Sequence, residues 1–91
     1  MNEIIEQLKQ AVNISPDNIP LRLHLAEMML QQNLLSDASE QFSEILKREH
    51  GNTKALSGLA DIYFKQSKYS AAIILFEQLQ QQHARPAGRR A

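Results

Sequence analysis

Three histidines are the side chains in this sequence best suited to metal binding or acid–base chemistry. His24 lies three residues before Glu27, so on a helix the two would share a face and could form half of a metal site. His50 directly follows Glu49, and His83 stands near the end of the chain. Because zinc sites need three or four protein ligands, one histidine and one carboxylate are too few. A structural or solvated role is therefore favoured for the histidines, and no metal site is predicted.

The other residue types argue against catalysis. The sequence has no cysteine, which excludes a disulfide, a thiol nucleophile and a thiolate metal site. Its three glycines, Gly51, Gly58 and Gly88, do not form a phosphate-binding loop or the turn that carries a catalytic serine. We therefore expect no catalytic residue, no cofactor and no enzyme activity in this chain.

Length and charge narrow the class of protein further. At 91 residues the chain has the length of one small domain. Three of its ten basic residues lie in the last seven positions, so residues 1–84 carry seven basic against ten acidic residues, which disfavours a nucleic-acid surface. The opening MNEIIEQLKQ is not a signal peptide, and no segment has the length and apolarity to cross a membrane. We expect a cytoplasmic protein.

The spacing of apolar residues predicts an all-α fold of five helices. Apolar side chains recur every three or four positions and are interrupted by Pro, Gly, Asn and Ser. The predicted helices cover about 4–14, 21–32, 37–47, 53–66 and 70–83. Asn33 suits a left-handed turn, and Ser36 and Ser70 are candidate N-caps of the third and fifth helices. The tail at 85–91 has no apolar anchor and is predicted to be disordered, or to be an addition to the natural chain.

The chain also repeats itself at a fixed spacing along the sequence. An offset of 34 pairs identical residues in the two halves: Leu25 with Leu59, Ala26 with Ala60, Gln32 with Gln66, Ser36 with Ser70, Ala38 with Ala72 and Phe42 with Phe76. The same offset places Ile4 and Leu8 before Ala38 and Phe42, and Asn18 before Asn52. The sequence therefore consists of half a repeat followed by two full ones.

These residues resemble the tetratricopeptide repeat family, whose 34-residue unit contains two helices. The second copy carries the family pattern at Leu56, Leu59, Ala60, Tyr63, Ala72, Phe76 and Leu79, and the first carries it at Leu25, Ala26, Met29, Ala38, Phe42 and Ile45. Arg22 departs from the family, in which a large aromatic is usual at that position, and His50 and Ala84 stand where Pro16 supplies the expected proline. The resemblance implies one domain over 1–84, with a half repeat at 1–18 and repeats at 19–52 and 53–84. It also implies a right-handed superhelix of antiparallel helix pairs.

Small residues at matching positions indicate where helices approach closely. We assign this role to four alanines, Ala26, Ala38, Ala60 and Ala72. Gly58, inside the fourth helix, costs about 1 kcal/mol relative to alanine, and close packing would explain it. His24 at the equivalent position of the first copy indicates that bulk is tolerated there. Each helix pair leaves an apolar face open, so neighbouring repeats must cover one another.

The resemblance further implies a scaffold that binds a peptide or protein along a concave groove lined by the first helix of each repeat. The groove residues expected here are Leu23, Glu27, Leu30, Gln31, Lys54, Ser57, Asp61, Phe64 and Lys65. Glu27 and Asp61 stand where chaperone-binding members need an asparagine, and two carboxylates would repel an acidic C-terminal tail. A ligand with basic and apolar character is expected instead. The alternative is that Glu27 and Asp61 are solvated charges, paired with Gln31 and Lys65 four residues on.

The fifth helix is unexpectedly apolar at Ile73, Ile74 and Leu75, where the first copy has polar residues. No later helix of the chain could cover this patch, which marks an interface or an aggregation hazard. A homodimer, a missing repeat of a longer protein and simple exposure are the three explanations. The stretch 16–30 also looks like the N-terminal repeats attached to some bacterial AAA-type ATPases. The predicted function is a protein–protein interaction scaffold, with a homo-oligomerisation module or a regulatory domain of a larger enzyme as alternatives.

Overall fold

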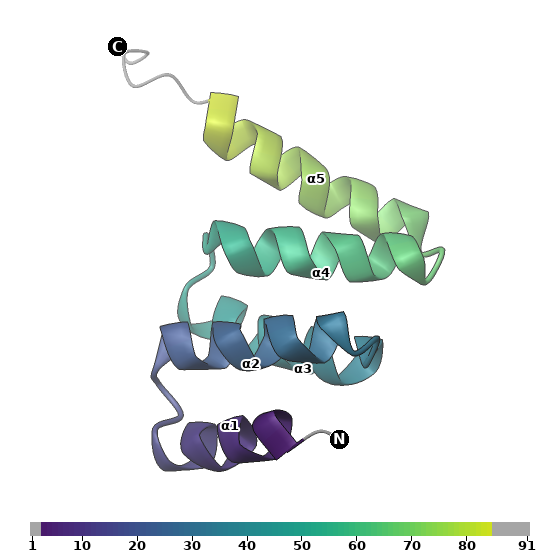
Figure 1. The fold of residues 1–91 in the computed structure, drawn as a ribbon. Coiled ribbons are helices and arrows are strands. Elements are labelled where there is room, and N and C mark those ends of the chain that lie inside the picture. Colours follow the sequence, from purple (N-terminus) through teal and green to yellow (C-terminus); the bar gives the residue numbers. More distant parts are fainter. Residues whose placement is uncertain (1–2, 85–91) are drawn as a thin grey trace.

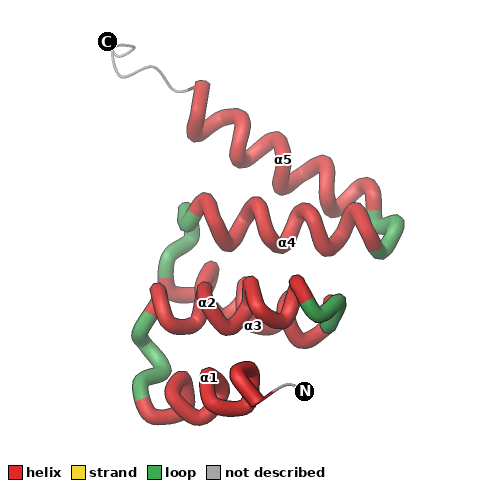
Figure 2. Tube along the Cα trace, viewed as in Figure 1, coloured by secondary structure: helices red, strands yellow, loops and turns green. Residues whose placement is uncertain are grey.

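The structure is a computed structural model that describes residues 3–84, with side chains described as far as residue 82. It is helical apart from short turns (Figure 2). The helices are α1 (Glu3–Ile14), α2 (Ile19–Gln31), α3 (Leu35–Arg48), α4 (Thr53–Lys65) and α5 (Tyr69–Ala84). The predicted all-α fold of five helices is thereby confirmed. The predicted tail at 85–91 lies outside the described residues.

The helices stack in chain order, each against the next (Figure 1). The consecutive pairs all pack together, and α2 also contacts α4 across the stack. The molecule is elongated and flat, with principal dimensions of 48, 30 and 17 Å. This is the arrangement of a helical repeat, in which each unit contacts only its neighbours.

Two asparagines at equivalent positions of the repeat begin the first helix of each full copy. Asn18 Oδ1 accepts a hydrogen bond from the backbone N–H of Leu21 at 3.1 Å, and Asn52 Oδ1 accepts one from that of Ala55 at 2.9 Å. Both asparagines have extended backbone, as N-cap residues do. The period seen in the sequence is therefore also present in the local hydrogen bonding.

The second helix of each repeat begins differently, and the prediction of two serine caps is wrong. α3 and α5 start at Leu35 and Tyr69, one residue before Ser36 and Ser70. A serine that already lies in the first helical turn cannot serve as N-cap, because that position requires non-helical backbone just outside the helix.

A left-handed residue precedes each of these two helices. Asn33 and Ser67, which are also equivalent positions of the two repeats, both have φ of 63°. After Asn33 the chain closes α2, because the N–H of Leu34 donates to the carbonyl of Met29 at 2.9 Å. This is the wide hydrogen bond of a Schellman helix end. The prediction for Asn33 is confirmed, while Ser67 was missed because serine is not a residue that usually adopts this conformation.

The core lies between successive helices. The four alanines assigned to close approach are almost completely buried, and the largest buried side chains are Phe42, Leu25, Met29, Ile45 and Ile62. A Cβ added to Gly58 would lie 2.4 Å from the Phe42 ring, so glycine is required where α4 crosses α3. The inference from His24 that this position tolerates bulk is therefore wrong for the second repeat. The first copy has Leu8 in place of Phe42 and so offers no such ring.

Arg22 occupies the position at which the family usually has an aromatic, and only 7% of it is exposed. Its guanidinium donates to the Pro16 carbonyl at 2.9 Å and to Gln41 Oε1 at 2.8 Å. Within the described part of the chain its Nε has no hydrogen-bond partner. Arg22 thus joins the turn after α1 to α3 with a long, partly apolar side chain in place of an aromatic ring.

Candidate binding surface

A hollow of about 680 Å³ opens between the two repeats. The residues that line it come from α2, α3, α4 and α5: Glu27, Leu30, Phe42, Thr53, Lys54, Ser57, Gly58, Asp61, Phe76 and Leu79. Five of the nine predicted groove residues are among them: Glu27, Leu30, Lys54, Ser57 and Asp61. They lie together because α2 and α4, the first helices of successive repeats, pack side by side.

A second hollow, of about 620 Å³, lies beside the start of α2 and the loop before α4. Leu23, another predicted groove residue, lines it together with His24 and Glu49. Glu27, Thr53 and Lys54 line both hollows, which therefore meet along these three side chains. We call the two hollows together the groove.

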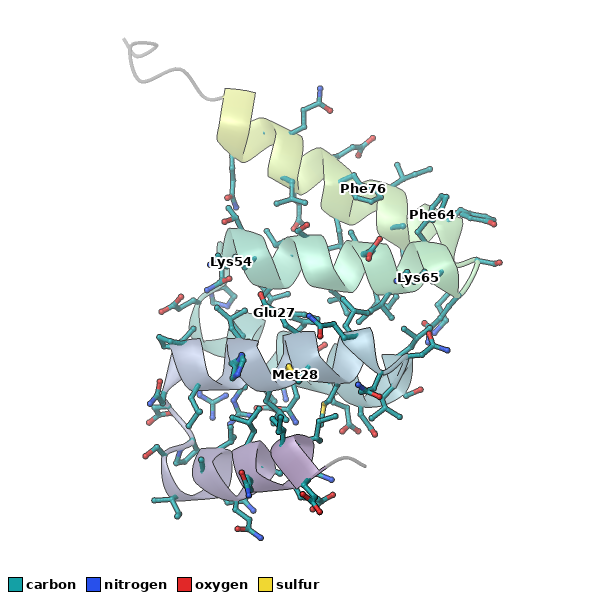
Figure 3. All side chains as sticks on the ribbon, viewed as in Figure 1. Glu27, Met28, Lys54, Phe64, Lys65 and Phe76 are labelled. Carbon is teal, nitrogen blue, oxygen red and sulfur yellow. The ribbon has the colours of Figure 1, made fainter. Side chains whose placement is uncertain are left out.

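The acids of the groove have different surroundings. Asp61 Oδ2 lies 3.7 Å from Lys65 Nζ, one helical turn on. This is the pairing expected if Asp61 is a solvated charge. This pair is half exposed, so it contributes little stability and can separate to meet a ligand. Glu27 is exposed on α2 and shares the lining of both hollows with Lys54 (Figure 3). The groove thus combines carboxylates, the ammonium group of Lys54 and an apolar wall.

Three predicted groove residues, Gln31, Phe64 and Lys65, do not line either hollow. Phe64 lies at the C-terminal end of α4, 56% exposed, and packs edge-to-face against Tyr69 with ring centres 5.4 Å apart (Figure 3). Phe64 therefore contacts α5 and lines neither hollow.

The apolar wall of the groove was not predicted as a binding surface. It includes Phe42, Phe76 and Leu79, which the sequence identified only as positions of the repeat pattern. Phe42 is 1% exposed because α4 covers it, whereas its counterpart Phe76 is 44% exposed. The signal available in the sequence was that its pattern shows no further repeat after the one that contains Phe76.

The predicted oligomer residues on α5 do not share one environment. Ile73 and Ile74 are 54% and 56% exposed, whereas Leu75 is partly buried and packs against the core. Only the two isoleucines are thus available on the surface. They are adjacent in sequence and therefore point to different sides of the helix.

The most pronounced electrostatic cluster lies away from the groove. Arg48, at the end of α3, contacts Asp17 at 2.9 Å and Glu44 at 3.0 Å. Hydrogen bonds from Arg48 and then Lys47 hold the pKa of Glu44 below its usual value of 4.5. Hydrogen bonding to Asp17 and Glu44 likewise raises the pKa of Arg48. This cluster fastens α3 to the turn between α1 and α2.

Among the side chains that the structure describes, no group of three or more could hold a metal ion. His24 and His50 are exposed, far from the three-ligand arrangement that a zinc site needs. Over the same part of the chain, none of the helices combines the length and apolarity needed to cross a membrane.

Antiparallel helices stacked as a two-helix repeat, around a groove between first helices, define a helical-repeat scaffold. A family model described as tetratricopeptide repeat matches residues 2–52, more than half of the chain. The chain belongs to the tetratricopeptide repeat family. Its members generally mediate protein–protein interactions and are typically non-catalytic scaffolds. A comparison with curated proteins found no match. The resemblance to ATPase-attached repeats stays a prediction.

Proposed function

We propose that the chain is a protein–protein interaction scaffold whose groove binds a peptide segment of a partner protein. The half repeat at 1–18 and the repeats at 19–52 and 53–84 would act as one binding unit. The observation that carries this proposal is the 680 Å³ hollow, because it gathers charged side chains and an apolar wall from four helices. A concave surface with a few converging polar groups is the usual form of a binding site.

The charges of the groove favour a ligand with basic and apolar residues. Glu27 and Asp61 line the same hollow, and a basic side chain placed between them would replace the contact that Lys65 makes with Asp61. Leu30, Phe76 and Leu79 would bury apolar side chains of the same ligand. A peptide with an acidic terminus would instead meet two carboxylates.

A selection from a random peptide display library tests this proposal. The wild-type chain is expected to select peptides that combine Lys or Arg with large apolar residues. The variant E27K/D61K is expected to bind those peptides at least about tenfold more weakly, since each like-charge contact costs of order 1 kcal/mol or more near a protein surface. Binding would be measured by fluorescence polarisation at low salt.

A matched control separates the groove from net charge. Glu3 and Glu40 are also exposed acids, on α1 and α3, and line neither hollow. The variant E3K/E40K changes net charge equally and should keep wild-type affinity. Equal loss in both variants, or selected peptides with no basic bias, would rule the groove proposal out.

A homodimer through α5 is the second candidate, supported by the exposure of Ile73 and Ile74. It predicts a concentration-dependent mass in sedimentation equilibrium, abolished when both isoleucines are changed to glutamine. A monomer at all concentrations would exclude it.

A further inference from the structure

One side of α5 carries an exposed apolar stripe that continues beyond the groove. Tyr69, Ile73 and Phe76 recur at helical spacing on it, and Phe64 extends it onto the end of α4 through its ring contact with Tyr69. All four are between 44% and 56% exposed. We call these four residues the α5 stripe. A contiguous aromatic and aliphatic surface of this kind marks a docking site.

The first repeat shows what covers the same surface. The counterparts of the α5 stripe in that repeat are Leu30, Leu35, Ser39 and Phe42, and each is buried or half-buried. α4 packs against α3 there, with Gly58 against the Phe42 ring. The occupant that fits the second repeat is therefore an amphipathic helix with a glycine facing Phe76.

Charge adds a second requirement for the occupant. Lys54 of α4, four residues before Gly58, lines both hollows together with Glu27 of α2. The counterpart of Glu27 in the second repeat is Asp61, at the edge of the same hollow as Phe76. A helix lying on the α5 stripe as α4 lies on α3 would bring its own residue four before the glycine toward Asp61. A basic residue there complements the carboxylate.

We propose that the α5 stripe binds a helix of another protein that carries Lys or Arg four residues before a glycine. This goes beyond the groove, since Tyr69, Ile73 and Phe64 line neither hollow. The binding mode is a helix seated on an apolar surface, with the small residue allowing close approach.

A second copy of this chain fits the requirement less well. Its own helix with the Lys54 and Gly58 pattern is α4, and Gly58 is already packed against Phe42. Its exposed helix α1 has Ala11 as a small residue, but Gln7 stands four residues before it, and Glu3 and Glu6 lie in its first turn. Those acids would approach Asp61 with like charge.

The test uses the full chain and a synthetic peptide with the sequence of residues 53–65, TKALSGLADIYFK, blocked at both ends. Backbone NMR spectra of the labelled chain, titrated with this peptide, are expected to shift at residues 69–80. A peptide with leucine in place of its glycine, or glutamate in place of its first lysine, is expected to bind at least about fivefold more weakly.

Two exposed isoleucines supply matched variants of the chain. I73Q removes a residue of the α5 stripe and is expected to weaken peptide binding by about fivefold or more. The exposed half of the Ile73 side chain is then no longer there for the bound peptide to bury. I74Q changes an equally exposed neighbour on another side of α5 and is expected to leave binding unchanged. Circular dichroism of both variants checks that the fold is kept.

The proposal is overturned by no shifts at millimolar peptide, by equal effects of I73Q and I74Q, or by shifts that leave α5, Asp61 and Phe64 unchanged. It is also overturned if the chain alone self-associates through the stripe, with I73Q abolishing association, because the occupant is then a second copy. The groove proposal is judged separately, since its selected peptides depend on Glu27 and Asp61 and should bind the I73Q variant normally.

Discussion

At the scale of single residues, the contact between Gly58 and Phe42 shows how a position that looks unfavourable for a helix becomes necessary. Glycine lowers the intrinsic stability of α4, but any Cβ at this position would overlap a phenylalanine ring that is 1% exposed and cannot move aside. The sequence suggested close packing at Gly58. It could not show which ring was involved, because Phe42 lies on another helix, well separated along the chain.

We predict that G58A lowers the free energy of unfolding by about 1–3 kcal/mol, because overpacking outweighs the better helix propensity of alanine. Changing Phe42 to leucine, the residue found at position 8, should recover part of this loss. The measurement is urea unfolding followed by circular dichroism. G51A serves as control, since its Cβ would meet only the end of the flexible Gln82 side chain at 3.4 Å. A G58A variant as stable as G51A would contradict the packing account.

Arg22 marks the limit of prediction at this scale. Its position in the family pattern indicated a large buried side chain, and the structure buries it. Its two hydrogen-bond partners, the Pro16 carbonyl and Gln41, could not be predicted because they depend on how the turn after α1 meets α3.

At the scale of helices, the bodies of all five were predictable, whereas the first residue was predicted correctly for α4 and missed by one or two positions for the others. Apolar periodicity locates a helix body, whereas α3 and α5 begin where a left-handed residue reverses the chain. The repeat offset paired Asn18 with Asn52 but did not identify them as the caps of α2 and α4, a role that the structure shows.

The end of α3 gives a pH-dependent prediction. The hydrogen bonds from Arg48 and Lys47 lower the pKa of Glu44, so its contribution to stability is full above about pH 4.5 and is lost as the pH falls through the lowered pKa. We therefore expect E44Q to lower the free energy of unfolding slightly at pH 7 and to have a shrinking effect below pH 4.5. Urea unfolding at a series of pH values measures this. E40Q removes an exposed acid from the same helix and serves as the control for net charge.

At the scale of the whole molecule, stability should be graded along the stack. α4 packs against α2, α3 and α5, whereas within the described residues α5 packs against α4 alone. We predict slower native-state hydrogen exchange for amides in α3 and α4 than for those in α5, because local opening needs less energy where fewer apolar contacts break. If amides of α5 exchange as slowly as those of α3 and α4 at high dilution, this end of the stack is more stable than its packing implies, and the prediction is wrong.

The groove was predictable in part because first helices of successive repeats must lie side by side, which brought together Glu27 and Asp61. The apolar wall of the groove was not predictable, because Phe76 is exposed only where no helix of the described residues covers it. A sequence pattern assigns Phe42 and Phe76 the same role, yet one is buried and the other half-exposed.

Residues at equivalent positions of the repeats also limit which segments of this chain can be exchanged or copied. The caps Asn18 and Asn52 make the same hydrogen bond and are interchangeable. When segments are exchanged at these two positions, the helix that follows the junction still has an asparagine cap. Phe42 and Gly58 are not interchangeable with Leu8 and His24, since a histidine brought against the phenylalanine ring would have no room. The segment that can be transplanted as a block is therefore α3 together with α4, taken across the boundary of the two repeats. A protein engineer who lengthens this scaffold should copy that block, or the second repeat, whose Gly58 would face Phe76, and not the first repeat, whose His24 would meet the ring.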